Sequence, residues 1–383
     1  MLSRCHQGVF SAEEEEAPML RADPKCDPEG KGTRYGILAM LLVGAGCGTL
    51  IYLGNPGNMG ICGACFLRDS AGALHLFDKP ASLPYLRPEI FGVVFGALLW
   101  MAIRGKWQAR SGSHAATRFF FGIWMGIGSL VFLGCPFRML QRLGGLDLTA
   151  WIALPGFIAG VGVGLYFEKR GYSVGKTQAA PAPVGLLFPG LMLLAGVLWF
   201  QGQLAGPGQD GGPPPPHAPW MYSLGIALVA GILLSATRFC AVTAGRQVFL
   251  KDRRMLLASL AMLIGFGLVV LTTGKAVPGI EGQPLAHTDH LWSALALALV
   301  GLCGCLAGGC PVRQLVMTGE GNADAAMAVA GILVGGALSH GFALASSGAG
   351  TTESGRLAIV VGLAIAVVYG ASRSMLASAK GSA

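Results

Sequence analysis

Charged residues are scarce in this chain of 383 residues. Lys, Arg, Asp and Glu together make up 12% of it, whereas soluble domains carry about 25%. Carboxylates are scarcer still in most of the chain, because seven of the nineteen Asp and Glu residues lie within the first 34 positions. The apolar runs contain no obvious proton-relay carboxylate. This composition excludes an ordinary soluble domain and indicates a membrane protein.

Several other signals are absent. No base-stacking or zinc-finger pattern accompanies the formal net charge of +8, so we predict no nucleic-acid partner and interpret Lys and Arg as topology signals and possible anion contacts. Residues 1–34 lack the apolar core of a secretory signal peptide, and we predict a disordered cytoplasmic tail there. Most of the ten cysteines lie in or beside apolar runs, which favours free thiols over disulfides.

Long apolar runs are what the sequence has in abundance. About 18 residues suffice for a helix to cross a bilayer, and the sixty glycines would let neighbouring helices pack closely. Ten membrane spans are predicted at 35–53, 89–104, 117–134, 148–167, 185–202, 219–236, 256–273, 291–309, 323–347 and 356–372. Four shorter apolar segments, at 58–67, 136–143, 240–250 and 311–317, are interpreted as half-helices that dip into the membrane. The lipid bilayer is therefore a predicted partner.

The loops between the spans alternate in charge. Lys and Arg gather after spans two, four, six and ten, whereas 203–218 and 348–355 contain none. The positive-inside rule then places both termini in the cytoplasm. We divide the chain into a tail (1–34), a first repeat (35–203), a Pro/Gly-rich external linker (204–218), a second repeat (219–373) and a cytoplasmic tail (374–383).

One short motif occurs twice. Gly-Cys-Pro-x-Arg-x-Leu occupies 134–140 and recurs 175 positions later at 309–315, each time after a long apolar run. Five identical residues that include Cys and Pro indicate an internal duplication. Because each half has five spans, an odd number, the second half should be inverted relative to the first. The predicted fold is an all-α polytopic membrane protein with two inverted five-span repeats and short re-entrant half-helices.

The duplicated motif predicts a ligand site at the start of a half-helix. The proline after each cysteine suits the first helical position, so Cys135 and Cys310 would cap helices whose N–H groups and dipole favour an anion. Arg138 and Arg313 lie within the first turn and would add fixed positive charge. A buried, apolar cysteine at an ordinary helix start is the alternative, but the recurrence of the motif favours a function.

A fainter pattern, Cys-x5-Arg, joins Cys62 to Arg68 and Cys240 to Arg246. An alternative register pairs Cys65 with Cys240 but loses the arginine. Cys62-x-x-Cys65 could also be a redox or metal pair. Inverted halves would bring the cysteines of both patterns together as four thiols stacked across the membrane, two entering from each side. Such weak donors suit a polarizable sulfur or selenium solute.

Other reactive side chains are weaker candidates. Cys303 and Cys305 lie within span eight, where helix packing is the simplest interpretation, although one thiol could face the pathway. His340 within span nine needs a polar partner, and packing competes with a role in transport. His287 and His290 could bind a metal, but a helix cap between them is the simpler interpretation.

Seven segments carry a resemblance to a known family. They lie at 58–69, 85–90 and 131–138 in the first half and at 282–289, 308–315, 319–324 and 344–347 in the second. Together they resemble the YeeE/YedE family of sulfur-transport membrane proteins, most closely its YedE-type selenium-metabolism members, over roughly 35–372. The resemblance implies a bacterial inner-membrane protein with an hourglass-like helical fold, in which an anion passes along cysteines at the constriction. Gln247 departs from the pattern, since the first copy has Asp69 there, and this weakens the case for Arg246.

We therefore expect a transporter, not an enzyme, that moves a small selenium or sulfur species, such as a thiosulfate-like anion, through a cysteine-lined central pathway. The predicted pathway residues are Cys62, Cys135, Cys240, Cys310, Arg68, Arg138 and Arg313, with Cys65, Cys303, Cys305, Arg246 and His340 as secondary candidates. No cofactor and no metal is expected, and a cytoplasmic sulfur-carrier protein is a partner by family analogy.

Two other functions remain open. One is a membrane sulfur carrier or sulfurtransferase that holds a persulfide or selenosulfide on one cysteine. The other is a metal transporter that uses His287 and His290. It ranks last, because acidic residues are nearly absent from the spans.

Overall fold

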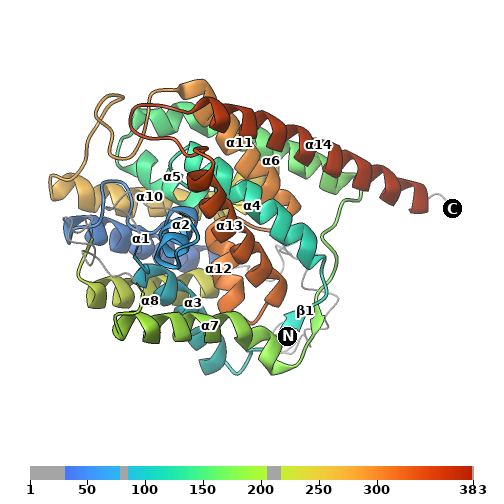
Figure 1. Cartoon of the computed structure of the whole chain (residues 1–383), viewed down its shortest axis with the longest axis horizontal. Coiled ribbons are helices and arrows are strands. Elements are labelled where there is room, and N and C mark those ends of the chain that lie inside the picture. The colour runs from blue at the N-terminus through green and yellow to red at the C-terminus, as the bar shows by residue number, and fades with distance from the viewer. Residues whose placement is uncertain (1–30, 78–84, 205–216, 382–383) are drawn as a thin grey trace.

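The computed structural model describes residues 31–77, 85–204 and 217–381, which form a bundle of α-helices with one two-stranded sheet (Figure 1). The first half contributes α1 (Lys31–Tyr52), α2 (Gly63–Ala73), α3 (Pro88–Ile103), α4 (Ala115–Val131), α5 (Pro136–Gly144), α6 (Leu148–Lys169) and α7 (Ala182–Phe200). The second half contributes α8 (Trp220–Thr237), α9 (Ala241–Arg246), α10 (Arg254–Thr272), α11 (His290–Leu306), α12 (Pro311–Gly319), α13 (Ala323–Gly341) and α14 (Glu353–Gly381). Nine helical segments of the described residues are long and apolar enough to cross a membrane, and the chain is an all-α membrane protein.

These helices correspond to the predicted spans and half-helices. The ten long ones match the ten spans, although α3 has only 16 residues, and α2, α5, α9 and α12 match the four half-helices. The first half-helix lies later than predicted, at Gly63–Ala73 instead of 58–67, because the extended Cys62 is its N-cap. Two predicted ends of long helices are also wrong. α13 stops at Gly341 instead of 347, because Ala343 adopts a left-handed φ of 51°. α14 continues to Gly381, because no Gly or Pro interrupts residues 372–380.

The predicted tails and linker fall largely outside the described residues. Residues 31–34 belong to α1 and not to a disordered tail, since they lie at the start of a continuous helix. Residues 1–30 and 205–216 lie outside the described ranges. The predicted cytoplasmic tail at 374–383 is helical as far as residue 381.

Glycine allows the long helices to approach closely. α1 packs on α10 and α3 on α8, and likewise α4 packs on α13 and α6 on α11. A Cβ atom on Gly44 would lie 2.1 Å from the carbonyl oxygen of Met262, and one on Gly265 would lie 2.1 Å from that of Leu41. A side chain at either glycine would push α1 and α10 apart. Each of the four pairs joins a helix of the first half to a helix of the second.

The connecting segments gather at two opposite ends of the bundle. At one end, which we call the linker end because α7 ends and α8 begins there, Asp147 pairs with Gly279. At the other, the sheet end, β1 (Arg110–Ser111) pairs antiparallel with β2 (Gln178–Ala179). α6 begins directly after Asp147 and ends shortly before β2, so it runs from the linker end to the sheet end.

The four short helices lie inside the bundle. Figure 1 shows α2 and α12 near its middle, with α1, α3 and α8 to one side and α4 and α13 to the other. α2 packs on α13 and α12, α5 on α10 and α6, and α9 on α6 and α10. Their residues are almost all buried. Broken backbone at membrane depth persists only where protein or a water-filled cavity satisfies it, and this fold supplies that enclosure.

Candidate functional site

Two cysteines of the first half meet at the starts of α2 and α5. Cys62 has an extended backbone and is the N-cap of α2, where its Sγ accepts a hydrogen bond from the Cys65 N–H at 3.4 Å. Cys135 is the N-cap of α5, and Pro136 occupies the first helical position as predicted. The Cys62 thiol donates to Cys135 Sγ at 3.6 Å, and both residues are fully buried. We call Cys62 and Cys135 the linker-end pair.

Two cysteines of the second half meet in a similar way. Cys240 is the extended N-cap of α9, and Cys310 is the N-cap of α12, with Pro311 after it. The Cys310 N–H donates to Cys240 Sγ at 3.4 Å. We call Cys240 and Cys310 the sheet-end pair. All eight cysteines of the described residues are free thiols, as predicted.

The two pairs lie against each other inside the bundle. Gly63 follows Cys62 of the linker-end pair, and Pro311 follows Cys310 of the sheet-end pair. A Cβ atom on Gly63 would lie 3.1 Å from the carbonyl carbon of Pro311. The rings of Phe137 and Phe239 meet edge to face with centroids 6.0 Å apart. The start of α2 therefore abuts that of α12, and the start of α5 lies beside that of α9.

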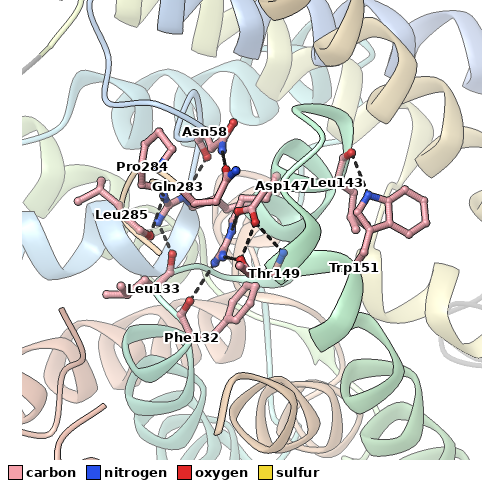
Figure 2. A network of polar contacts seen from close by, with 12 residues as sticks. Asn58, Phe132, Leu133, Leu143, Asp147, Thr149, Trp151, Gln283, Pro284 and Leu285 are labelled. Atoms are coloured by element: carbon pink, nitrogen blue, oxygen red, sulfur yellow. Dashed lines mark hydrogen bonds and ion pairs between the residues drawn. The ribbon is translucent and has the colours of Figure 1, made fainter. Parts of the chain in front are cut away.

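Arg138 binds the backbone of the linker end. Its Nε donates to the Asn58 carbonyl oxygen at 2.9 Å, and its Nη1 donates to that of Leu133. Its Nη2 lies 3.4 Å from the carbonyl oxygens of Pro284 and Leu285. Figure 2 shows these four residues grouped together.

Three of these carbonyl groups belong to residues in the left-handed conformation. The φ angles of Asn58, Leu133 and Leu285 are 55°, 60° and 51°, which is uncommon outside glycine. Charge-assisted hydrogen bonds to their carbonyls stabilise these strained turns. Arg138 was predicted to offer charge to an anion. In the structure its donors hold three chain segments together, and no carboxylate of the described residues forms an ion pair with it.

The arginine of the second motif copy has a different partner. Arg313 binds Glu320 through two nitrogens, with Nη1–Oε1 and Nη2–Oε2 distances of 3.0 and 3.1 Å. The Ser235 hydroxyl donates to Glu320 Oε1 at 2.8 Å. Identical residues of the motif are thus used for backbone binding in one half and for an ion pair in the other.

A cavity of about 240 Å³ lies at the sheet end, where α9 and α12 lead away from the sheet-end pair. Its charged lining comprises Arg110, Arg118, Arg238, Arg246, Arg313, Glu168 and Glu320. Cys305 also lines it and donates to the Val161 carbonyl oxygen at 3.7 Å. Cys303 is fully buried in α11. Of the two secondary candidates in span eight, Cys305 is therefore the one beside open space.

The arginines of the Cys-x5-Arg pattern form ion pairs in both halves. Arg246 Nη2 lies 2.5 Å from Glu168 Oε1. Arg68 Nη2 lies 2.6 Å from Asp69 Oδ1, and its Nη1 lies 3.5 Å from His340 Nε2, which gives this half-buried histidine its polar partner. Among the described residues, no hydrogen bond links Arg68 or Arg246 to the linker-end or sheet-end pair.

Sequence reasoning missed a buried ion pair beside the linker-end pair. Arg142 Nε lies 2.7 Å from Asp147 Oδ2, and their side chains are 1% and 0% exposed. Arg142 also donates to the Phe132 carbonyl oxygen at 3.0 Å and to Thr149 Oγ1 at 2.7 Å. Figure 2 shows Phe132, Asp147 and Thr149 close together. The available signal was helical spacing, since Arg142 lies four residues after Arg138 on one short helix.

Residues 287–290 anchor the linker end. His287 Nε2 lies 2.8 Å from the Val131 carbonyl oxygen, and its Nδ1 accepts from the Asp289 N–H at 3.2 Å, so both ring nitrogens have partners and burial lowers the pKa of His287. Asp289 precedes α11, but the predicted cap bond is not formed. Its carboxylate accepts instead from the Thr351 hydroxyl and N–H, which lowers the pKa of Asp289 to about 2.

A scan against protein-family models finds no match to this chain. A search of curated proteins likewise finds no match. The function is therefore argued from the chemistry and geometry of the site.

Proposed function

We propose that this chain is a transporter of the YeeE/YedE type, not an enzyme, which carries a small sulfur or selenium anion past the linker-end pair and then the sheet-end pair. One observation carries the proposal. Cys62 donates to Cys135 at 3.6 Å, and the residue after Cys62 abuts the residue after Cys310 in the interior. Thiols are weak donors and sulfur is polarizable, so such a row can contact a chalcogen atom without placing extra charge in the membrane.

The half-helices add partial charge at the same place. Cys62, Cys135 and Cys310 are the N-caps of α2, α5 and α12. The free N–H groups at a helix N-terminus are equivalent to roughly half a positive elementary charge. Anions bind at such termini, and this supports an anionic solute over a metal cation.

We also propose that the two halves are inverted repeats, and close helix contacts support this. A Cβ atom on Gly126 would lie 2.7 Å from the Ile332 carbonyl oxygen, and one on Gly301 would lie 2.8 Å from that of Phe157. Gly301 lies 175 positions after Gly126, and Ile332 lies 175 positions after Phe157. The second contact is therefore equivalent to the first with the two halves of the chain exchanged. The same exchange relates Gly156–Ala294 to Gly331–Phe119 and Gly160–Ala298 to Gly335–Ile123.

An exchange of halves is what a two-fold axis produces. With five long helices in each half, successive halves enter from opposite sides, and the axis lies in the membrane plane. Lys and Arg are frequent in 104–118 and 169–176, near the sheet end. The positive-inside rule then puts the sheet end and both termini in the cytoplasm of a bacterial inner membrane. A cytoplasmic sulfur-carrier protein would exchange the solute at that end.

Uptake into proteoliposomes tests the transport proposal. We expect Cys135→Ala and Cys310→Ala each to lower uptake of labelled thiosulfate or selenite at least tenfold (about 1.4 kcal/mol in the barrier), because each removes one thiol from the row. Cys47→Ala is the matched control, since Cys47 is fully buried in α1 but outside both pairs. Correct insertion is checked by size-exclusion chromatography. Wild-type uptake by both pair variants would refute the pathway.

A second function is favoured by the 3.6 Å contact between the Cys62 and Cys135 sulfur atoms. Two adjacent thiols would suit a membrane sulfur carrier that holds a persulfide or selenosulfide on one of them. Intact-protein mass spectrometry after exposure to substrate separates the two functions. An added mass of one sulfur or selenium atom on either cysteine identifies the carrier, whereas unmodified thiols after measured uptake favour the transporter.

A further inference from the structure

The segment that leads into Cys62 is bound by a glutamine of α5. Gln141 Oε1 accepts from the Gly60 N–H at 2.8 Å and from the Ile61 N–H at 3.3 Å. Gln141 Nε2 donates to the Ile61 carbonyl oxygen at 2.6 Å. One side-chain amide thus satisfies three backbone groups in the two residues directly before this cysteine.

The same short helix carries the other thiol of the linker-end pair. Cys135 is the N-cap of α5, and Gln141 lies six residues after it. Arg138, three residues before Gln141 and therefore on the same face of the helix, donates to the Asn58 carbonyl oxygen at 2.9 Å. The helix that is capped by one cysteine therefore binds the segment that leads to the other, and the two sulfur atoms lie 3.6 Å apart.

A second amide binds the same segment. Asn55 Nδ2 donates to the Gly60 carbonyl oxygen at 3.1 Å, and Asn55 Oδ1 accepts from the Ala218 N–H at 2.8 Å. A Cβ atom on Gly60 would lie 2.3 Å from the Cys47 carbonyl oxygen, so a larger residue would displace the segment. The N–H and C=O groups of residues 60 and 61 all bind side-chain amides, and the position of the next residue is fixed accordingly.

Packing alone does not require a glutamine at this position. Gln141 is fully buried, and its counterpart 175 positions later is Val316, which has no polar side chain. Burying an amide costs free energy unless its hydrogen bonds are made. The fully buried glutamine of α12, Gln314, binds elsewhere, since it donates to the Ala307 carbonyl oxygen at 3.0 Å. The bonds of Gln141 to residues 60 and 61 are therefore a feature of the first half that its buried position would not by itself call for.

We propose that Gln141 is a positioning residue, which holds Cys62 against Cys135 so that the two thiols act together on one solute atom. Groups that are fixed in a productive arrangement contact a ligand without the entropy cost of bringing them together. The part of the proposal that concerns the solute rests on the proposed transport function. The part that concerns the spacing of the two thiols does not.

Oxidation of the full chain in neutral detergent tests the spacing. Diamide takes up the hydrogens of two thiols, is itself reduced to a hydrazine and leaves the two sulfur atoms bonded, so peptide mass spectrometry can follow the joining of Cys62 to Cys135. Gln141→Met keeps the volume but removes the three hydrogen bonds, and it should slow this reaction roughly tenfold because the thiols are no longer held in contact. Gln314→Met is the matched control, since Gln314 is equally buried but donates to Ala307 and Gly309.

Gln141→Glu provides a second readout that a loss of packing would not reproduce. A protonated carboxyl group can donate to the Ile61 carbonyl oxygen and accept from the Gly60 N–H, as the amide does, whereas a carboxylate cannot donate. The oxidation rate of this variant, taken relative to the wild type at the same pH, should therefore rise as the pH is lowered. A relative rate that does not change with pH would contradict the role assigned to these hydrogen bonds.

Uptake into proteoliposomes tests the functional part. Gln141→Met should raise the KM for labelled thiosulfate several-fold, and Gln314→Met should leave it at the wild-type value. An unchanged KM despite slower oxidation would overturn this part. An unchanged or faster oxidation rate in Gln141→Met, or no bond between Cys62 and Cys135 in the oxidised wild type, would overturn the whole proposal. Slower oxidation together with no uptake by the wild type would refute transport and leave the positioning role of Gln141 intact.

Discussion

The linker end and the sheet end contain the same motif but use its arginine differently. Arg138 donates to backbone carbonyls, whereas Arg313 pairs with Glu320 at an open cavity. The difference extends to a turn before each motif cysteine. Leu133 is left-handed with φ 60°, and its counterpart 175 positions on is Gly308, with φ 82°. Glycine adopts this conformation without strain, so the second copy needs no arginine to hold the turn.

A second difference lies at the end of the short helix that follows each cysteine. The first half has the buried ion pair of Arg142 and Asp147. The residues 175 positions later are Met317 and Asn322, which carry no charge. The linker end therefore keeps its charges inside, where they fix loops, and the sheet end places its charges around a cavity. The two halves thus share a motif, yet one end is closed by internal contacts and the other contains a cavity with a charged lining.

The largest expected effect comes from the buried ion pair. Arg142→Met should lower the free energy of unfolding by about 3–5 kcal/mol, because it leaves the Asp147 carboxylate buried without its cation. The double variant Arg142→Met/Asp147→Asn installs the residues of the second half and should regain most of that loss, since Asn322 caps α13 through the Ala325 N–H. Unfolding in mixed detergent micelles, followed by tryptophan fluorescence, measures both. A double variant as unstable as the single one would show that the halves are not interchangeable here.

The next effect concerns the two motif arginines. Arg138→Gln should cost about 2–3 kcal/mol of unfolding free energy, because charged hydrogen bonds to three strained turns are lost. Arg313→Gln should cost about 1 kcal/mol or less, because Glu320 is 15% exposed at the cavity and keeps the Ser235 hydroxyl. The two variants are compared in the same micelle assay. Equal losses would mean that the contacts of the two arginines do not set their roles.

The smallest effect concerns another pair of equivalent turns. Leu146 has φ 61° and is 40% exposed, and its counterpart Gly321 has φ 96°. Leu146→Gly should raise the free energy of unfolding by up to about 1 kcal/mol, since it relieves left-handed strain. Gly321→Ala should lower it by about 1–2 kcal/mol, because its Cβ would also lie 2.6 Å from the Gln108 carbonyl oxygen. Shifts of the same sign in both variants would contradict this reading of the turns.

Much of the fold could be predicted because hydropathy and breakers act locally. The long apolar runs predicted the ten long helices, and the prolines after Cys135 and Cys310 predicted where α5 and α12 begin. The end of α13 was predicted wrongly, because the left-handed residue of the turn is Ala343, a residue type that rarely adopts this conformation, and not the nearby Gly341. The cap at Asp289 failed for a similar reason, since its carboxylate is taken by Thr351, 62 positions away in the chain.

Composition and order of residues suffice to show that this chain crosses a membrane with helices, and that two half-helices begin with Cys-Pro 175 positions apart. Composition and local sterics suffice for that, because a bilayer admits few backbone conformations. The partners of the charged side chains, by contrast, depend on the packing of the folded chain. Arg138 meets carbonyls 80 and 147 positions away, and Arg246 meets a carboxylate 78 positions away. A guanidinium group donates to any nearby oxygen, so its partner depends on which segments the packing of glycine-rich helices brings within reach.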